Sequence, residues 1–418
     1  MDKGRFPKSN LENTKVQAAA AEAAKGGAVV KIVNYVLTKA IESRASDIFI
    51  EPVDDAIQVR FRVDGVLQRF ENFSLSIHSG IMGRLKVISD LDISEHRFPQ
   101  DGRFKMKFPG KEVDFRISTM PSSLGERVVL RILDKERVIL DVDKLGFDER
   151  AVNLLKAAMH KPYGMVLTCG PTGCGKTTTL YAAMKHIDSM EKNITTVEDP
   201  IEYQLHGINQ LAVDANIGLT FETALRSILR QDPDIILVGE IRDSQPAQMA
   251  VRSALTGHLV LSSLHTATSS GAIVRLMNMG VEPFLIASSC LVVSAQILVR
   301  ILCPQCKQRY AVPDAIIQEM EKYGVQLAEF KVERYIYKTK GCSYCSQTGY
   351  HGRTAIVEVL PISPEIKKLI EGNCQEIQIR KQAQREGMVT LRQGGLDLVL
   401  NGVTSLEEIL RCTVADKK

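Results

Sequence analysis

In the first part of the chain, the spacing of apolar residues predicts a small domain that contains both helices and strands. Apolar residues from Val29 to Ile41 recur every three or four positions, which predicts a helix. Residues 57–63 alternate between apolar and polar side chains, as a half-buried strand does, and a hairpin turn signal, Asp64 before Gly65, follows them. The remaining predicted elements are a helix at 77–88 and strands at 48–50, 103–108, 112–117 and 126–133. We expect an α+β domain at 29–137, with a tail or linker at 1–28 before it and a linker at 138–145 after it.

Strands and helices then alternate over residues 146–300. The predicted strands are 166–168, 193–197, 234–240 and 258–264, and the helices between them include 220–230 and 245–256. This alternation predicts an α/β domain, with a mostly parallel sheet between layers of helices. The longest uncharged run, 284–299, has about 16 residues, which is too short to span a membrane. We predict a buried core helix for it.

The last third of the chain changes character. Residues 301–347 contain two C-x-x-C pairs with a helix predicted at 313–323 between them. Residues 348–418 form a C-terminal subdomain that is mainly helical and amphipathic. Its predicted helices are 364–371, 376–386, 391–401 and 405–412.

Composition narrows the class of protein. The 418 residues are 44% hydrophobic and 24% charged, which is ordinary for a globular chain. The net charge of +4 does not indicate a nucleic-acid binder, for which a clustered basic excess is expected. No apolar segment follows the first residues, so no signal peptide is predicted and we expect a cytoplasmic protein.

Residues 170–177 read G-P-T-G-C-G-K-T, between a predicted strand and a helix-forming segment. This is a phosphate-binding loop in the context it requires, because glycines let backbone N–H groups turn toward phosphate oxygens at a helix N-terminus. Lys176 is expected to reach the β- and γ-phosphates of ATP, and the Thr177 hydroxyl to bind Mg²⁺. The predicted nucleotide-binding residues are Gly170, Pro171, Thr172, Gly173, Cys174, Gly175, Lys176, Thr177 and Thr178.

Acidic residues follow two of the predicted strands. Glu240 ends the apolar run 235–238 and is the candidate for polarising the attacking water; the alternative is a carboxylate that only pairs with Arg242. A second group, 198–202, also follows a strand and should lie at the same sheet edge. We expect its acids to approach Mg²⁺ or water, with simple solvation as the alternative. They are Glu198, Asp199 and Glu202.

Two histidines flank the fourth strand of this domain. His265 follows the strand at its carboxyl end, where the γ-phosphate is expected, and His258 precedes it. We predict that His265 senses the nucleotide and that His258 contacts it. Ordinary core or surface histidines are the alternative.

Four cysteines have the spacing of a metal site: Cys303, Cys306, Cys342 and Cys345. Four thiolates satisfy tetrahedral Zn²⁺ without leaving an open position, so this site should be structural. Redox cysteines or unpaired thiols are the alternative. The other five cysteines have no partner spacing and are interpreted as ordinary small residues.

With these residues assembled, the sequence resembles the secretion ATPase family that powers type II secretion and type IV pilus assembly. The likeness runs from about Val29 to the C-terminus. It rests on A-S-D-I-F-I-E-P at 45–52, P-Q-D-G-R at 99–103, G-E-R-V-V-L-R at 125–131 and the phosphate loop. Residues 196–202 resemble the family's aspartate box, 225–243 its Walker B region and 257–266 its histidine box. The four cysteines match the assembly and export members, whereas retraction ATPases usually lack them.

The resemblance implies a homohexamer with a PAS-like first domain, a RecA-like second domain and ATP between them. It also implies that Arg116 and Arg131, which match the family's arginine pair, reach the phosphates. In many members a docking domain precedes the small domain, and here only residues 1–27 do.

The expected partners are an inner-membrane platform protein and pilus or secretion assembly proteins, with peripheral attachment at the inner membrane and no nucleic acid. The rival interpretation is a P-loop nucleic-acid translocase or DNA-uptake motor. The weak net charge and the lack of a basic, aromatic-rich stripe speak against it.

Overall fold

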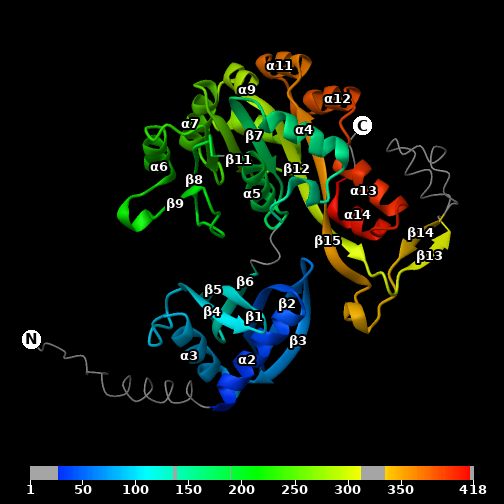
Figure 1. The fold of residues 1–418 in the computed structure, drawn as a ribbon. Helices are drawn as coiled ribbons and strands as arrows, with labels where there is room; N and C mark the ends of the chain where they lie inside the picture. Colours follow the sequence, from blue (N-terminus) through cyan, green and yellow to red (C-terminus); the bar gives the residue numbers. More distant parts are fainter. Residues whose placement is uncertain (1–26, 135–138, 189, 312–334, 415–418) are drawn as a thin grey trace, which may run out of the picture. The chain divides into compact units, whose positions relative to one another are not determined.

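The chain forms two compact units, Met1–Val138 and Ile139–Lys418 (Figure 1). The structure is a computed structural model, and it describes residues 27–134, 139–188, 190–311 and 335–414. The helix expected at 313–323 and nearly all of the tail expected at 1–28 lie outside the described residues. Each unit is treated by itself below.

The first unit is one antiparallel sheet with two helices on one face. The strand order is β3-β2-β1-β6-β5-β4. The helices bury Leu37 and Leu85 against inward-facing strand residues such as Ile48. Its elements are α2 (Gly27–Glu42), β1 (Ala45–Val53), β2 (Ala56–Val63), β3 (Val66–Ser74), α3 (His78–Ile88), β4 (Gln100–Phe108), β5 (Lys111–Ser122) and β6 (Gly125–Leu133). The expected α+β architecture is therefore present.

The predicted hairpin turn lies between β2 and β3. Asp64 and Gly65 have φ of 49° and 84°, and a tight hairpin turn of this kind requires positive φ at both positions. The second strand of the hairpin, β3, was not predicted. Most of its side chains are polar or half-exposed, so it has no clear alternation of buried and solvated positions.

The second unit is a seven-stranded sheet between two layers of helices. The strand order is β15-β12-β7-β11-β10-β8-β9, and every neighbouring pair is parallel except β12 with β15. The sheet strands are β7 (Gly164–Cys169), β8 (Ile194–Glu198), β9 (Asn209–Ala212), β10 (Ile235–Val238), β11 (Leu259–Leu264), β12 (Cys290–Leu302) and β15 (Tyr350–Pro361). The expected mostly parallel α/β sheet is confirmed.

Helices cover both faces of this sheet (Figure 1). Two of them, α4 and α5, share a buried core with one face, and α6 to α9 share another with α11 and α12. The remaining two, α13 and α14, pack on the far ends of β12 and β15. The helices are α4 (Glu149–Met159), α5 (Lys176–Ile187), α6 (Phe221–Ile228), α7 (Ser244–Leu255), α8 (Ser269–Asn278), α9 (Pro283–Ser289), α11 (Pro364–Glu371), α12 (Glu376–Arg385), α13 (Leu391–Leu400) and α14 (Leu406–Cys412).

The helix predicted at 284–299 is wrong. The segment is the short helix α9 followed by β12, which lies between β7 and β15. A strand covered on both faces is apolar at nearly every position, so its sequence shows no period of two, and periodicity alone does not separate it from a buried helix. The β-branched residues Val292, Val293, Ile297 and Val299 favour the strand.

Candidate active site and metal centre

The phosphate loop connects the buried strand β7 to α5. Gly170, Gly173 and Gly175 all have positive φ, at 145°, 77° and 95°. A Cβ on Gly170 would lie 2.3 Å from the carbonyl oxygen of Gln296, so no larger residue fits there. These glycines give the loop a concave backbone at the N-terminus of α5, which is the arrangement that binds phosphate groups.

Lys176 lies back over this loop. Its Nζ donates to the carbonyl oxygens of Gly170 and Pro171, at 2.8 and 3.1 Å. An ammonium held by two carbonyl groups can exchange them for negatively charged phosphate oxygens, which are stronger acceptors. Thr177 follows in the first turn of α5. The glycine loop, the Lys176 ammonium and the Thr177 hydroxyl together fit a nucleoside triphosphate, with Mg²⁺ bound by Thr177.

Four parallel strands bring the predicted residues to one edge of the sheet. The register pairs Cys169 with Leu264 and Val238 with Ser262, so β7, β11 and β10 end together. β8 ends beside β10 in the same way. Neighbouring strands are about 4.8 Å apart, so the end of β10 is about 10 Å from the start of the phosphate loop, and that of β8 about 14 Å. Gly170 and His265 directly follow β7 and β11, Glu240 lies two residues past the end of β10, and Glu198 is the last residue of β8.

The Glu240 carboxylate lies between two cationic or polar neighbours. It accepts a hydrogen bond from Arg242 on one oxygen, and His265 Nε2 lies 3.1 Å from the other. Partial burial raises its pKa, but the Arg242 guanidinium and His265 outweigh burial, and the pKa lies below its usual value. Glu240 is therefore ionised at neutral pH. Glu240 forms the ion pair with Arg242 that was the alternative interpretation. It also contacts His265, which follows β11 at the sheet edge where the phosphate loop begins.

Glu198 is held differently from the other acids. It is only 3% exposed. It accepts from the hydroxyl of Tyr181 on α5, from Thr196 Oγ1 at 2.6 Å and from Gln210 Nε2 at 3.2 Å. Three donors from the protein fix this carboxylate between α5 and β9. Asp199, by contrast, is exposed, and Glu202 is half-buried on the loop that follows.

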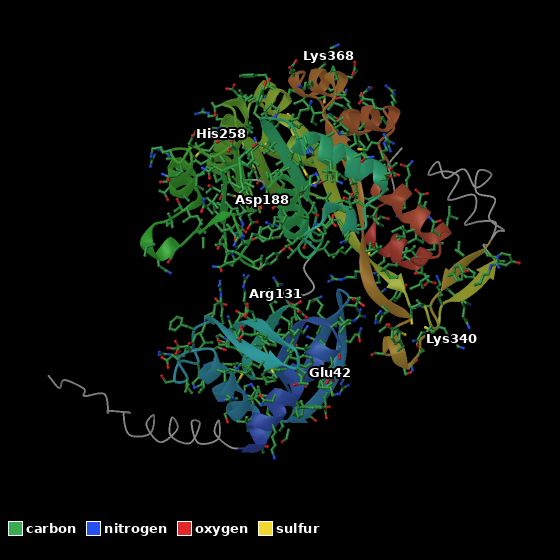
Figure 2. The ribbon with its side chains drawn as sticks, in the orientation of Figure 1. Glu42, Arg131, Asp188, His258, Lys340 and Lys368 are labelled. Carbon is green, nitrogen blue, oxygen red and sulfur yellow. The ribbon has the colours of Figure 1, made fainter. Side chains whose placement is uncertain are left out.

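His258 lies at the other edge of the sheet. Its carbonyl oxygen accepts from the N–H of Gly164, the first residue of β7, at 3.1 Å. The ring Nδ1 lies 3.0 Å from the carbonyl oxygen of Ser253. The phosphate loop follows the last residue of β7, so the length of a buried strand separates His258 from the loop of its own chain (Figure 2).

Arg116 and Arg131 are neighbours in the first unit. They pair in register across β5 and β6, on the sheet face away from α2 and α3 (Figure 2 labels Arg131). Asp47 on β1 accepts from Arg131 Nε at 3.0 Å, and this bond leaves the two terminal nitrogens of the guanidinium for another acceptor. Asp47 also pairs with Arg62, at 3.4 Å. Asp47 was not among the predicted site residues.

The four predicted cysteines form one cluster. Their Sγ atoms all lie within 4.8 Å of one another, and three of the pairs are 3.7 to 3.8 Å apart. A tetrahedral ion with Zn–S bonds of about 2.3 Å requires sulfur atoms about 3.8 Å apart, so the geometry fits zinc. Two further strands, β13 (Gln308–Ala311) and β14 (Tyr335–Lys338), pair into a hairpin that follows the first cysteine pair and precedes the second.

One of these thiols is already in an environment that favours the thiolate. Burial raises the pKa of Cys345, but the backbone N–H groups of Cys342 and Gly349, at 3.3 and 3.2 Å from its Sγ, outweigh burial. The result is a pKa of about 6. Metal ligation requires the deprotonated form of cysteine, so this backbone arrangement suits a zinc ligand.

Comparison with known proteins assigns the family. The model of the family "Type II/IV secretion system protein" matches residues 22–411. The chain belongs to this family. Among its relatives, the type IV pilus assembly ATPase PilB of Myxococcus xanthus (strain DK1622) is 46% identical over 412 residues, which are 98% of this chain and 72% of the relative. The type II secretion system protein E of Aeromonas hydrophila is 46% identical over 388 residues, 93% of this chain and 76% of the relative.

Solved structures of an ATPase and of a pilus retraction motor share the fold. The Legionella pneumophila ATPase DotB matches with a TM-score of 0.66 at 18% identity, over 90% of this chain and 94% of that one. The pilus retraction motor PilT with bound ADP matches with a TM-score of 0.60 at 24% identity, over 91% and 96%. With its phosphate loop, this member of the type II/IV secretion family is an ATPase. No helix among the described residues is both long and apolar enough to cross a membrane.

Proposed function

We propose that this secretion-family member is a hexameric motor. Hydrolysis of ATP would drive the assembly of pilin or pseudopilin subunits through an inner-membrane platform protein, with the motor in the cytoplasm and attached peripherally to that membrane. The observation that supports this most directly is the meeting of the phosphate loop, His265 and Glu240 at one edge of a parallel sheet. The 46%-identical relatives are named as a pilus assembly ATPase and a type II secretion protein, which supports the choice of machine.

The chemistry assigned to this edge is the attack of water on the γ-phosphate. Residues 170–178 bind the triphosphate through backbone N–H groups, and Lys176 transfers its ammonium from carbonyl to phosphate oxygens. Thr177 would hold Mg²⁺, which neutralises phosphate charge when bound. The ionised Glu240 orients the water and accepts its proton, and His265 keeps this carboxylate in place.

The three acids at 198–202 have separate roles in this proposal. Glu198 is a positioning residue, because its carboxylate is fully engaged by Tyr181, Thr196 and Gln210. Asp199 and Glu202 lie on the loop beyond it and approach the hydrated metal. For His258 we propose no contact with the nucleotide of its own chain, since it lies at the opposite sheet edge.

The arginines of the first unit complete the site in this proposal. Arg116 and Arg131 offer planar guanidinium forks that suit the charge developing on the γ-phosphate. Closure of the first unit onto the nucleotide, in the same subunit or a neighbouring one, would turn hydrolysis into motion. We propose that residues 146–300 form the motor domain, 301–347 the zinc-binding subdomain and 348–418 a C-terminal, mainly helical subdomain.

Two measurements test this function. Lys176→Ala should weaken the binding of a fluorescent ADP analogue by about 100-fold, because two charge-assisted contacts are lost, and should abolish ATP hydrolysis. Circular dichroism controls for folding. Retained turnover in this variant would remove the phosphate loop from the mechanism. Mass measurement in a non-hydrolysable ATP analogue should give six copies of the chain, and a monomer under those conditions would overturn the hexamer.

A further inference from the structure

A buried glutamine lies against the phosphate loop from a strand that the mechanism above does not use. Strand β12 is parallel to β7, and the last pair between them is Ala295 with Cys169. At that level β7 ends and turns into the phosphate loop, whereas β12 continues to Leu302. Gln296 is therefore the first residue of β12 beyond the end of β7. It is 2% exposed and carries an amide side chain in a strand whose other residues are apolar except for Ser294 and Arg300.

Both ends of the Gln296 amide are engaged. Its Nε2 donates to the carbonyl oxygen of Cys174 at 2.9 Å, and its Oε1 accepts from the hydroxyl of Thr179 at 2.9 Å. Cys174 belongs to the phosphate loop and Thr179 to the first turns of α5. Because the carbonyl oxygen of Cys174 can only accept, the amide nitrogen must face the loop, and the Thr179 hydroxyl donates to Oε1. The side chain thus ties the loop, the helix that follows it and β12 together.

The contact with Cys174 determines the direction of one N–H group. A trans peptide holds its C=O and its N–H on opposite sides. The carbonyl of Cys174 points to Gln296, so the N–H of Gly175 in the same peptide points away from Gln296. Gly175 has φ of 95°, and its own carbonyl oxygen accepts from the Thr179 N–H at 3.0 Å, so the groups on both sides of this residue are fixed.

We propose that Gln296 is a positioning residue of the nucleotide site, which holds the Cys174–Gly175 peptide with its N–H toward the phosphates. A glycine-rich loop is free to rotate such a peptide, and rotation would replace an N–H donor by a carbonyl oxygen that repels phosphate. The Gln296 bond opposes this rotation before the nucleotide arrives. The inference rests on the proposed nucleotide site and concerns its preorganisation.

Gln296→Met is the direct test, because it keeps the length and most of the volume of the side chain and removes both hydrogen bonds. We expect the Kd for a fluorescent ADP analogue to rise about tenfold, the effect of one lost buried hydrogen bond at a binding loop. The KM for ATP should rise by a similar factor. The kcat at saturating ATP should change by less than about threefold, because Glu240 and its neighbours are untouched.

Ser294→Ala is the matched control on the same strand. Ser294 is buried two residues earlier, and its hydroxyl bonds the carbonyl oxygen of Leu167 and the hydroxyl of Thr168 on β7, at 3.2 and 3.1 Å, rather than the loop. It should lower the thermal unfolding midpoint as Gln296→Met does and leave the Kd unchanged. If Gln296→Met does not fold, Thr179→Val replaces it as the test. This variant removes only the hydrogen bond from the Thr179 hydroxyl to Gln296 Oε1, and it should raise the Kd about threefold.

An unchanged Kd in folded Gln296→Met, or in Thr179→Val where that variant replaces it, would overturn the inference. So would an equal rise in Kd for Ser294→Ala, which would make the effect one of general stability. Wild-type protein that binds no ADP, or a Lys176→Ala variant that binds as well as wild type, would instead overturn the proposed nucleotide site.

Discussion

The charge on Glu240 is set by neighbours that come from two different strand ends. Arg242 follows it on the same loop, and His265 comes from the end of β11. Their hydrogen bonds and charges outweigh the effect of burial and keep the pKa of the carboxylate below its usual value. A base that remains ionised in weak acid accepts a proton over a wider pH range than an unpaired glutamate would.

This arrangement predicts a pH effect. Activity that needs ionised Glu240 is present above its pKa and is lost as the pH falls through it. Arg242→Ala removes the largest influence that lowers this pKa, so the acidic limb of the kcat profile should move to higher pH. Arg242→Lys keeps a positive charge and should move the limb less. An unmoved limb in Arg242→Ala would mean that Glu240 is only an ion-pair partner.

Single residues were predictable from sequence where a motif assigns them. The glycines, Lys176 and the four cysteines have fixed spacings along the chain, and the structure places them as a loop and a cluster. The partners of Glu198 come from α5, β8 and β9, and no spacing connects those segments. A weak signal did exist for Gln296, because a lone amide in an apolar strand must find hydrogen-bond partners inside the protein.

The cysteines of the cluster come from several elements of the fold rather than from one. Cys303 follows β12, Cys345 ends a short turn, and β15 begins five residues later. A metal between them would therefore fasten β12 and the edge strand β15 to the paired strands β13 and β14. Their sulfur positions already match tetrahedral zinc, so a bound ion would contribute stability without a change of fold.

Cys345→Ser should abolish this site. The zinc content, measured by elemental analysis, should fall from about one per chain to almost none, and the thermal unfolding midpoint should fall by roughly 5–10 °C. Cys374→Ser, which changes a half-buried cysteine outside the cluster, should keep its zinc. Equal zinc content in the Cys345 variant and the wild type would rule out the site.

At the scale of elements, periodicity identified most helices and failed for particular strands. The four C-terminal helices each expose one polar face, and all four were predicted within about two residues. By contrast, β9 has four residues, too few to establish an alternation. Strand β15 was missed because residues 355–360 are all buried, so no alternation of buried and solvated positions identifies a strand there, and Glu358 interrupts the apolar run.

At the scale of the molecule, the chain consists of two units with different halves of the proposed site. The second unit contains the phosphate loop and Glu240, and the first contains Arg116 and Arg131 on the sheet face away from α2 and α3. Hydrolysis by such a chain would need both units, so the arginines are the residues whose loss separates binding from turnover.

Arg131→Ala should lower kcat by about 1,000-fold, a typical effect for an arginine that stabilises charge on a transferred phosphoryl group. Its Kd for the ADP analogue should stay within a few-fold of wild type. Arg97→Ala, at an exposed arginine of the same unit, is the control and should retain activity. Full turnover in Arg131→Ala would exclude this arginine from the site.

Mixing variants tests whether one subunit completes the site of another. Lys176→Ala subunits lack a working phosphate loop, and Arg131→Ala subunits lack the arginine. If the arginine acts on a neighbouring subunit, co-assembly should restore part of the activity that each variant lacks alone. No recovery in co-assembled complexes would place the arginine in the site of its own chain.

The most direct test of the account is ATP hydrolysis by Glu240→Gln, measured as phosphate release beside binding of the fluorescent ADP analogue. The substitution keeps the shape of the side chain and removes its charge. We expect a kcat at least about 100-fold below wild type with nucleotide affinity preserved, because the carboxylate acts on water and not on the bound phosphates. Turnover equal to that of wild type would contradict it.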